Sequence, residues 1–301
     1  YLRANERVGE YELRAKTGGP YGGKAILEIL KDGTVLHEIE RDPTTGYDHK
    51  SYGFTHDRRF VVSGGSHGVL SLYETETGKK VRDFVGHTGD VWAVAVSPDD
   101  KTLVSGSADQ TVRLWDLESG TNLLTIFVGT DREWVAWTPE GYYTASLNGD
   151  KYIGWHVNQG VDKAAKFYPA AQFAKQFYRP DVVAEQLKVR NIEVALKRAN
   201  ERRGGELAGQ PVVPAPDIRD ILPPLVVVAQ PHRPETVVTN DRLAVTAIVK
   251  SHLPITDVSV FLNGIQVAGQ PAGVSKGDPR ERSVELEVTL QEGENVLRVV
   301  A

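Results

Sequence analysis

The sequence predicts a mainly β protein, in which part of a β-propeller is followed by a short helical connector and a β-sandwich. Three observations lead to this fold class. A repeat of about 42 residues fills the first half, helix-type spacing follows, and alternating apolar strands end the chain. The expected boundaries are 1–157 for the propeller portion, 158–204 for the connector, 205–224 for a proline-rich linker and 225–301 for the sandwich.

The repeat aligns residues 54–78 with residues 96–120 without a gap. A further shift of about 40 residues puts Trp155 in the place of Trp115. Each period holds short β-rich segments separated by turn residues, and a period of about 40–45 residues with four strands is typical of a propeller blade. One blade cannot bury both of its faces alone, so the repeats are expected to stack around an axis.

The repeats give two full blades, the outer two strands of one blade before them (25–30 and 34–39), and three strands of one blade after them. Propellers need at least about four blades to close. We therefore expect the missing blades to lie upstream, or two chains to pair their arcs into one ring. Residues 1–17, with Tyr11, are a candidate for the outermost strand of the last blade.

One repeat carries Gly86-His87, then Ser105 and Asp109, then Trp115. This pattern resembles a WD repeat. The resemblance implies that His87, Ser105, Asp109 and Trp115 form a buried hydrogen-bonded relay that locks the blade. Such a relay is physically sensible, since a buried carboxylate needs donors and a buried indole N–H needs an acceptor.

The neighbouring repeats depart from this pattern. The preceding repeat has His67 in place of the Asp, Tyr73 in place of the Trp, and no Gly-His before them. The last repeat keeps Trp155 but has residues 129–131 in place of Gly-His. Their relays are expected to be incomplete. His, Ser and Asp are also the residue types of a hydrolase triad, but the blade spacing favours a structural relay.

Two tryptophans suggest a partner surface. Trp92 and Trp134 lie one period apart, each at the start of an expected inner strand and shortly after Asp90 and Arg132. They would then occupy the same phase of successive blades. In WD-repeat proteins the matching surface near the central channel often binds partners, and aromatic side chains ringed by charge often anchor interfaces. The alternative is that both pack between blades or line the channel.

Residues 158–204 hold twice as many basic as acidic residues and predict helices over 170–178, 181–189 and 192–203. Their phenylalanines need burial, so docking onto the propeller or onto a neighbour is favoured over a nucleic-acid or membrane role. The last part predicts six strands, two of them joined by a hairpin at Asn263-Gly264. This number of short strands suggests an Ig-like sandwich. The expected strands are Leu225–Ala229, Leu243–Lys250, Val258–Leu262, Ile265–Ala268, Ser283–Leu290 and Asn295–Val300.

Composition limits the function classes. The 301 residues include 35 Lys and Arg against 40 Asp and Glu, and the net charge of −5 argues against a protein that coats DNA. The chain has no Cys, which excludes thiolate zinc sites and a cysteine nucleophile. The eight His have no metal-ligand spacing on a helix, so neither a metal nor a cofactor is expected. Met is also absent, so we expect a piece of a longer chain or omitted methionines.

The order of parts resembles the non-catalytic region of bacterial proteins that pair WD repeats with a caspase-like peptidase. Residues 134–183 carry the most specific part of this resemblance. The resemblance implies a peptidase, with its His and Cys, after the Ig-like module. We therefore expect a non-catalytic cytoplasmic scaffold that binds protein partners and neither nucleic acid nor membrane. The alternatives are a stand-alone module, a periplasmic or cell-surface module, and a hydrolase in its own right.

Overall fold

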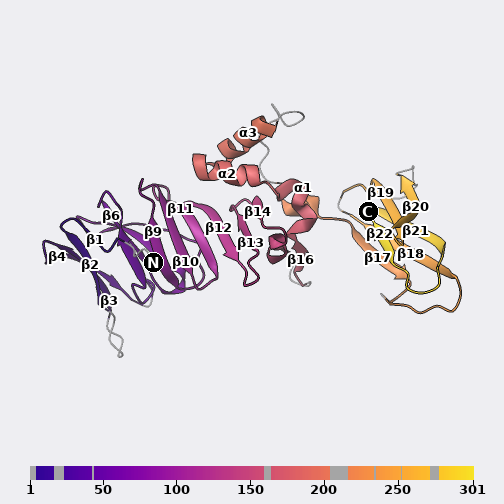
Figure 1. Ribbon diagram of the computed structural model, residues 1–301, viewed down its shortest axis with the longest axis horizontal. Coiled ribbons are helices and arrows are strands. Elements are labelled where there is room, and N and C mark those ends of the chain that lie inside the picture. Colours follow the sequence, from indigo (N-terminus) through magenta and orange to yellow (C-terminus); the bar gives the residue numbers. More distant parts are fainter. Residues whose placement is uncertain are drawn as a thin grey trace. The chain divides into compact units, whose positions relative to one another are not determined.

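The computed structural model describes residues 5–16, 24–42, 44–158, 164–203, 216–233, 235–251, 253–271 and 278–301. They belong to two compact units, Tyr1–Ala215 and Pro216–Ala301 (Figure 1). The division falls inside the predicted linker 205–224, of which residues 205–215 lie outside the described residues. The polyproline character of that linker stays a prediction.

Two four-stranded antiparallel sheets open the first unit, and each has its strands in chain order. Sheet I consists of β1 (Arg7–Val8), β2 (Tyr11–Lys16), β3 (Ala25–Lys31) and β4 (Thr34–Arg41). Sheet II consists of β5 (Ser51–Phe54), β6 (Phe60–Gly64), β7 (Leu70–Glu74) and β8 (Lys80–Asp83). Asp32 and Gly33 both have positive φ, which is the type I′ geometry that joins β3 to β4 tightly.

Sheet I corrects two expectations. The segment around Tyr11 is not the outermost strand of the last blade, because β2 pairs with β3 from Tyr11↔Lys31 to Lys16↔Ile26. The first repeat therefore contributes four strands rather than two. The physical reason is the alternation of β2, which buries Tyr11 and Leu13 against sheet II and turns its charged residues outward.

Sheet III has six strands in the order β14-β13-β12-β11-β10-β9. Its strands are β9 (Val91–Val96), β10 (Thr102–Ser107), β11 (Thr111–Asp116), β12 (Asn122–Val128), β13 (Trp134–Trp137) and β14 (Tyr143–Ala145). β13 is hydrogen-bonded to β12, from Thr125↔Trp137 to Val128↔Trp134. The last repeat therefore extends the third sheet, and the expectation that it forms a separate three-stranded blade is wrong.

The third strand of that last repeat also leaves the sheet. β15 (Gly154–Val157) pairs with β16 (Lys166–Pro169) and not with β14. The Trp155 ring lies 5.2 Å from the Phe173 ring and 4.9 Å from the Phe177 ring. These aromatic contacts partly cover the indole with the segment that follows, which gives the strand a reason to pair there.

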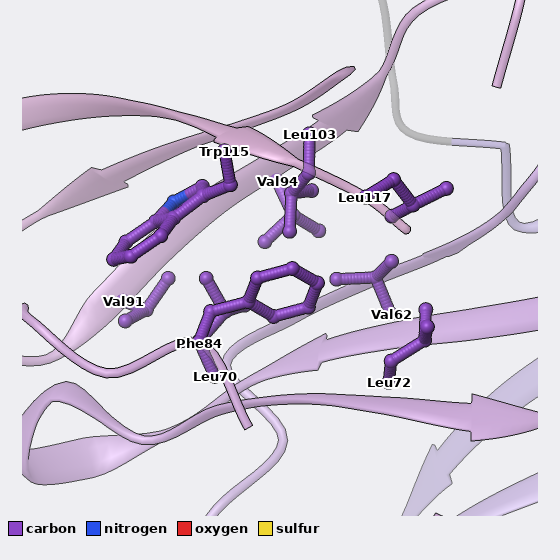
Figure 2. Packing of buried hydrophobic residues seen from close by; sticks show 9 residues of the cluster. All are labelled: Val62, Leu70, Leu72, Phe84, Val91, Val94, Leu103, Trp115 and Leu117. Atoms are coloured by element: carbon purple, nitrogen blue, oxygen red, sulfur yellow. The ribbon is translucent and has the colours of Figure 1, made fainter. Parts of the chain in front are cut away.

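Apolar layers hold the three sheets together. Sheets I and II share a cluster that includes Leu27, Ile29 and Phe54, all nearly fully buried. Sheets II and III share a second cluster, in which Trp115 and Phe84 lie 5.8 Å apart between ring centroids (Figure 2). Burying each such side chain stabilises the fold by about 1.5–3 kcal/mol. The stacking of sheets expected for successive blades therefore holds from sheet I to sheet III.

After β16 the connector is helical, and this helical part begins with a 3-10 turn. Its helices are α1 (Ala174–Phe177), α2 (Pro180–Val189) and α3 (Ile192–Arg203). The expected helix over 170–178 is divided between the 3-10 turn Ala170–Phe173 and α1. Val183 of α2 packs against Leu124 and Ala136, so α2 covers part of sheet III. Among the described residues no helix is long and apolar enough to cross a membrane.

The second unit consists of two three-stranded sheets, β17-β18-β21 and β20-β19-β22. Their strands are β17 (Leu225–Gln230), β18 (Arg242–Lys250), β19 (Asp257–Leu262), β20 (Ile265–Pro271), β21 (Glu281–Thr289) and β22 (Leu297–Val300). Val249, Val260 and Val284 join the two sheets in one core. Six strands are present where six were expected, while the Ig-like assignment stays a prediction.

Candidate functional site

The relay residues of sheet III form one hydrogen-bonded chain. His87 precedes β9, Ser105 lies on β10, Asp109 lies in the turn after it, and Trp115 lies on β11. The His87 Nδ1 is 2.8 Å from Asp109 Oδ2, and its Nε2 is 2.8 Å from Ser105 Oγ. The Trp115 Nε1–H donates to the same Ser105 Oγ at 2.8 Å. The structure therefore brings all four together.

The protonation of this chain follows from its partners. Burial opposes ionisation of Asp109, but hydrogen bonds from Thr111, His87 and Thr88 outweigh it and lower the pKa of Asp109 to about 2. Burial lowers the pKa of His87 although the Asp109 carboxylate opposes this. His87 is therefore neutral near pH 7. Because an ionised carboxylate only accepts, Nδ1 carries the proton and Nε2 accepts the Ser105 hydroxyl proton.

The order Ser–His–Asp is the order of a hydrolase triad, so burial has to decide between catalysis and structure. Ser105 is 1% exposed and Trp115 is 0% exposed. The indole N–H also occupies a lone pair of the hydroxyl oxygen. A nucleophile must reach its substrate. The geometry supports a lock between the strands of sheet III.

Sheet II contains a related but different set of contacts. The His49 Nδ1 lies 2.8 Å from Ser63 Oγ, and its Nε2 lies 3.0 Å from the carbonyl oxygen of Ile39. The guanidinium of Arg41 donates to the Ser63 carbonyl at 2.8 Å and to its hydroxyl at 3.2 Å. A Cβ at Gly65 would lie 2.7 Å from the carbonyl oxygen of Asp48 and 2.8 Å from that of Gly46, so this position needs glycine.

His67 does not take the place of the relay Asp in sheet II. Its side chain is exposed, and its backbone N–H donates to Asp90 Oδ1 at 3.1 Å. Sequence alignment missed His49 because it lies 14 residues before its serine, whereas His87 lies 18 residues before Ser105. A gapless shift therefore aligns the two histidines with other residues. A search that allowed a four-residue gap would have found His49.

The family model described as "WD domain, G-beta repeat" matches residues 78–116, which contain the whole hydrogen-bonded chain of sheet III. The chain therefore contains a WD repeat over these residues. The remaining resemblance, to bacterial peptidase-associated proteins with an Ig-like module, has no counterpart in this match.

Curated relatives agree with the WD repeat. The chain is 29% identical over 133 residues to "Serine-threonine kinase receptor-associated protein" of Gallus gallus, which covers 44% of this chain and 37% of the relative. It is 31% identical over 109 residues to "WD repeat-containing protein 1" of Xenopus tropicalis, covering 34% and 18%. It is 34% identical over 93 residues to "Small ribosomal subunit protein RACK1" of Neurospora crassa, covering 31% and 29%. The chain thus spans well under half the length of these relatives.

The surface around Trp92 lies where the loops of sheet II meet the edge strand β9 of the WD repeat. Trp92 is 58% exposed, and the Lys50 Nζ lies 4.7 Å from the centroid of its ring. Lys50 also lies 3.3 Å from the Asp90 carboxylate and 3.6 Å from that of Asp48. A cation over an indole face is attracted by the ring quadrupole. These contacts hold the exposed indole in one orientation.

Further residues enlarge this surface. Tyr47 is 47% exposed, and its ring lies edge-on to the His67 ring at 5.3 Å. The His67 backbone N–H and the Lys50 ammonium lower the pKa of Asp90. Sequence reasoning missed four members of this surface, namely Tyr47, Asp48, Lys50 and His67. Asp48 and Lys50 precede β5 at the same repeat phase as Asp90 and Trp92, which is the signal that could have found them.

Trp134 and Arg132 lie elsewhere. Trp134 is on β13, which is separated from β9 by three strands of the same sheet. At about 4.8 Å per strand, the two tryptophan backbones are about 19 Å apart. The expectation that Trp92 and Trp134 occupy the same phase of successive blades is therefore wrong, because β13 continues sheet III rather than starting a new blade.

The loop before β13 has its own rigid contacts. The Glu133 carboxylate accepts hydrogen bonds from the Asn148 backbone at 3.1 Å and side chain at 2.9 Å, and from Ser146. Arg132 has a positive φ of 69° in this turn. Trp134 is 39% exposed and donates its backbone N–H to Ser146 Oγ at 2.8 Å. Arg132 and Trp134 thus belong to a second exposed area. Among the described residues no group of three His, Asp or Glu could hold a metal ion.

Proposed function

We propose that this WD-repeat chain is a non-catalytic scaffold that binds a protein partner through the surface formed by Tyr47, Asp48, Lys50, Asp90 and Trp92. The observation that carries the proposal is an exposed indole covered by the Lys50 ammonium, which is itself held by the carboxylates of Asp48 and Asp90. Ordering such a side chain before binding lowers the entropic cost of association. Tryptophans in this setting are frequent binding hot spots.

The experiment compares Trp92→Ala with Trp134→Ala in the 301-residue chain. Each variant is used as bait in an extract of the source cells, and captured proteins are quantified against the unmodified chain. We expect Trp92→Ala to reduce capture of the main partner at least tenfold, while its urea midpoint stays unchanged. If Trp134→Ala alone reduces capture, the contact surface is the one next to Arg132, and the surface proposed here is rejected.

A narrower proposal concerns a longer protein of which this chain would be one region. We propose that the chain is the regulatory region of a caspase-like peptidase, which rests on the segment order in the sequence alone. The WD-repeat relatives named above are eukaryotic and give no support for that context. Reading the coding DNA past residue 301 tests it, since an α/β domain with a His and a Cys must follow. A cytoplasmic location is likewise a proposal, which cell fractionation tests.

The expected pairing of two chains into one ring needs the outer face of sheet I to pack on the outer face of sheet III. On sheet I, Arg14, Glu28 and Glu38 are paired side by side on that face. On sheet III the corresponding face presents apolar residues, including Val112 and Ile126. Burying charges against an apolar face is costly. We therefore do not propose the head-to-tail ring.

A further inference from the structure

The strand β17 is an unprotected edge of the second unit. It is the first strand in the sheet order β17-β18-β21, so one side of its backbone has no partner strand among the described residues. Its sequence, Leu-Val-Val-Val-Ala-Gln, contains neither charge nor proline. Leu225 and Val227 are each 47% exposed and Val228 is 39% exposed. Free backbone groups on an apolar edge are a template for pairing with another strand.

The opposite edge of the same sheet is protected. β21 carries four charged residues within nine positions, namely Glu281, Arg282, Glu285 and Glu287. Two β21 strands paired with each other would set carboxylates near one another, and like charges on facing positions are destabilising. β17 has no such obstacle. An uncharged strand can pair with its own copy without facing any like charge.

The side chains of β17 would also match across such a pair. Val226 points into the core of the unit, whereas Leu225 and Val227 point outward, opposite Lys250 and Ile248 of β18. A second β17 running antiparallel would place the outward Leu225 and Val227 of the two copies on one face. Apolar cross-strand pairs contribute about 0.2–1 kcal/mol each.

We propose that β17 pairs antiparallel with β17 of a second copy of this chain, which joins two three-stranded sheets into one six-stranded sheet. The pairing is isologous, with a twofold axis beside Val227. With this axis Val227 faces Val227 of the second copy, Val226 faces Val228 and Leu225 faces Ala229. Such an interface is far smaller than about 1,000 Å², so the dimer is weak and depends on concentration. The proposal does not depend on the partner surface around Trp92.

Sedimentation equilibrium of the 301-residue chain tests the proposal. We expect the average mass to rise from 33.1 kDa toward twice that value as concentration rises. Val227→Lys should raise the dissociation constant of the dimer at least tenfold, because two ammonium groups would then face each other. Val267→Lys is the matched control, since Val267 is 43% exposed on β20, the other edge strand without charge. A monomer at all concentrations, or an effect of Val267→Lys alone, would overturn the proposal.

Because the chain contains no Cys, a single introduced thiol offers a second test that does not rely on weakening the dimer. Val227→Cys introduces one thiol, and paired strands bring two such positions within the Cα separation of about 4.4–6.8 Å that a disulfide requires. We expect mild oxidation to cross-link this variant at least ten times faster than Val237→Cys, which carries its thiol at a 98% exposed position off the strand. If the two variants cross-link at equal rates, the disulfides form by random collision between chains, and the β17 pairing is rejected.

Discussion

At the scale of single residues, Ser105 is the point on which the relay of sheet III depends. Its hydroxyl accepts from Trp115 and donates to His87, and all three side chains are shielded from water. Removing it leaves a buried N–H and a buried ring nitrogen without partners. An unpaired buried polar group costs about 1–3 kcal/mol.

We therefore expect Ser105→Ala to lower the free energy of unfolding by roughly 2–6 kcal/mol, given about 1–3 kcal/mol for each of the two groups left unpaired. The measurement is urea denaturation followed by circular dichroism. Trp115→Phe in the Ser105→Ala background completes a double-mutant cycle, in which the combined loss should be smaller than the sum of the single losses. Strict additivity would show that the indole and the hydroxyl are not coupled.

His49 gives a second prediction, on pH. Burial, and secondarily the Arg41 guanidinium, lower the pKa of His49 to about 3, whereas the unfolded value is about 6.5. Below about pH 6.5 the unfolded chain therefore takes up a proton that the folded chain refuses, so stability falls as pH falls. The slope from this residue approaches about 1.4 kcal/mol per pH unit, and the lowered pKa of His87 acts in the same direction.

Urea unfolding at pH 7.5, 6 and 5 measures this slope. His49→Gln should flatten it between pH 6 and 5, whereas the exposed His232→Gln should leave it as in the parent chain. Carboxylates stay ionised over this range, so they add little to the slope. An unchanged slope in His49→Gln would mean that another group takes up the proton.

At the scale of elements, α2 takes a place where a further blade would stack. Val183 is 4% exposed against sheet III, and Arg190, which ends the helix in the left-handed conformation, donates to Thr102 Oγ1 at 2.7 Å and to Asp116 at 3.1 Å. The helix thus covers apolar surface and is fixed at its carboxyl end. Sheet III needs this cover because β13 and β14 have no sheet stacked on that face among the described residues.

Val183→Asp should detach α2, because an unpaired carboxylate buried on an apolar face is strongly unfavourable. We expect limited trypsin digestion to cut at Lys188 and Arg190 much faster in this variant than in the parent chain. Val194→Asp is the control, since Val194 is 40% exposed on α3. Equal protection of the two variants would show that α2 does not depend on Val183.

The elements also show what the sequence can and cannot predict. The period placed sheet II and the strands β9–β12 correctly, because these strands depend on local alternation and on the repeat. The relay residues came from the resemblance to a WD repeat and not from the period. It failed at β13, where the choice between a new blade and a longer sheet depends on Trp155 packing against Phe173 and Phe177. Those contacts join segments that share no repeat. The other members of the surface around Trp92 were missed because they come from different loops, with Lys50 over the Trp92 ring and the His67 backbone bonded to Asp90.

At the scale of the whole molecule, the chain divides into two compact units that differ in their chromophores. All five Trp and all eleven Tyr lie before residue 216. Trp fluorescence therefore reports only on the first unit, while far-ultraviolet circular dichroism reports on the strands of both. Each unit has its own apolar core, around Trp115 in the first and around Val260 in the second.

Separate cores predict separate unfolding. We expect the fluorescence transition in urea to be a single step, and the circular dichroism curve to show a further step that fluorescence does not follow. Coincident transitions are the mark of a two-state protein, so their coincidence here would mean that the units unfold as one. Val249→Ala, which opens a cavity in the second core and should cost about 0.5–3 kcal/mol, identifies the steps. It should move only the step that fluorescence does not detect, and a shift of the fluorescence transition would contradict the independence of the two units.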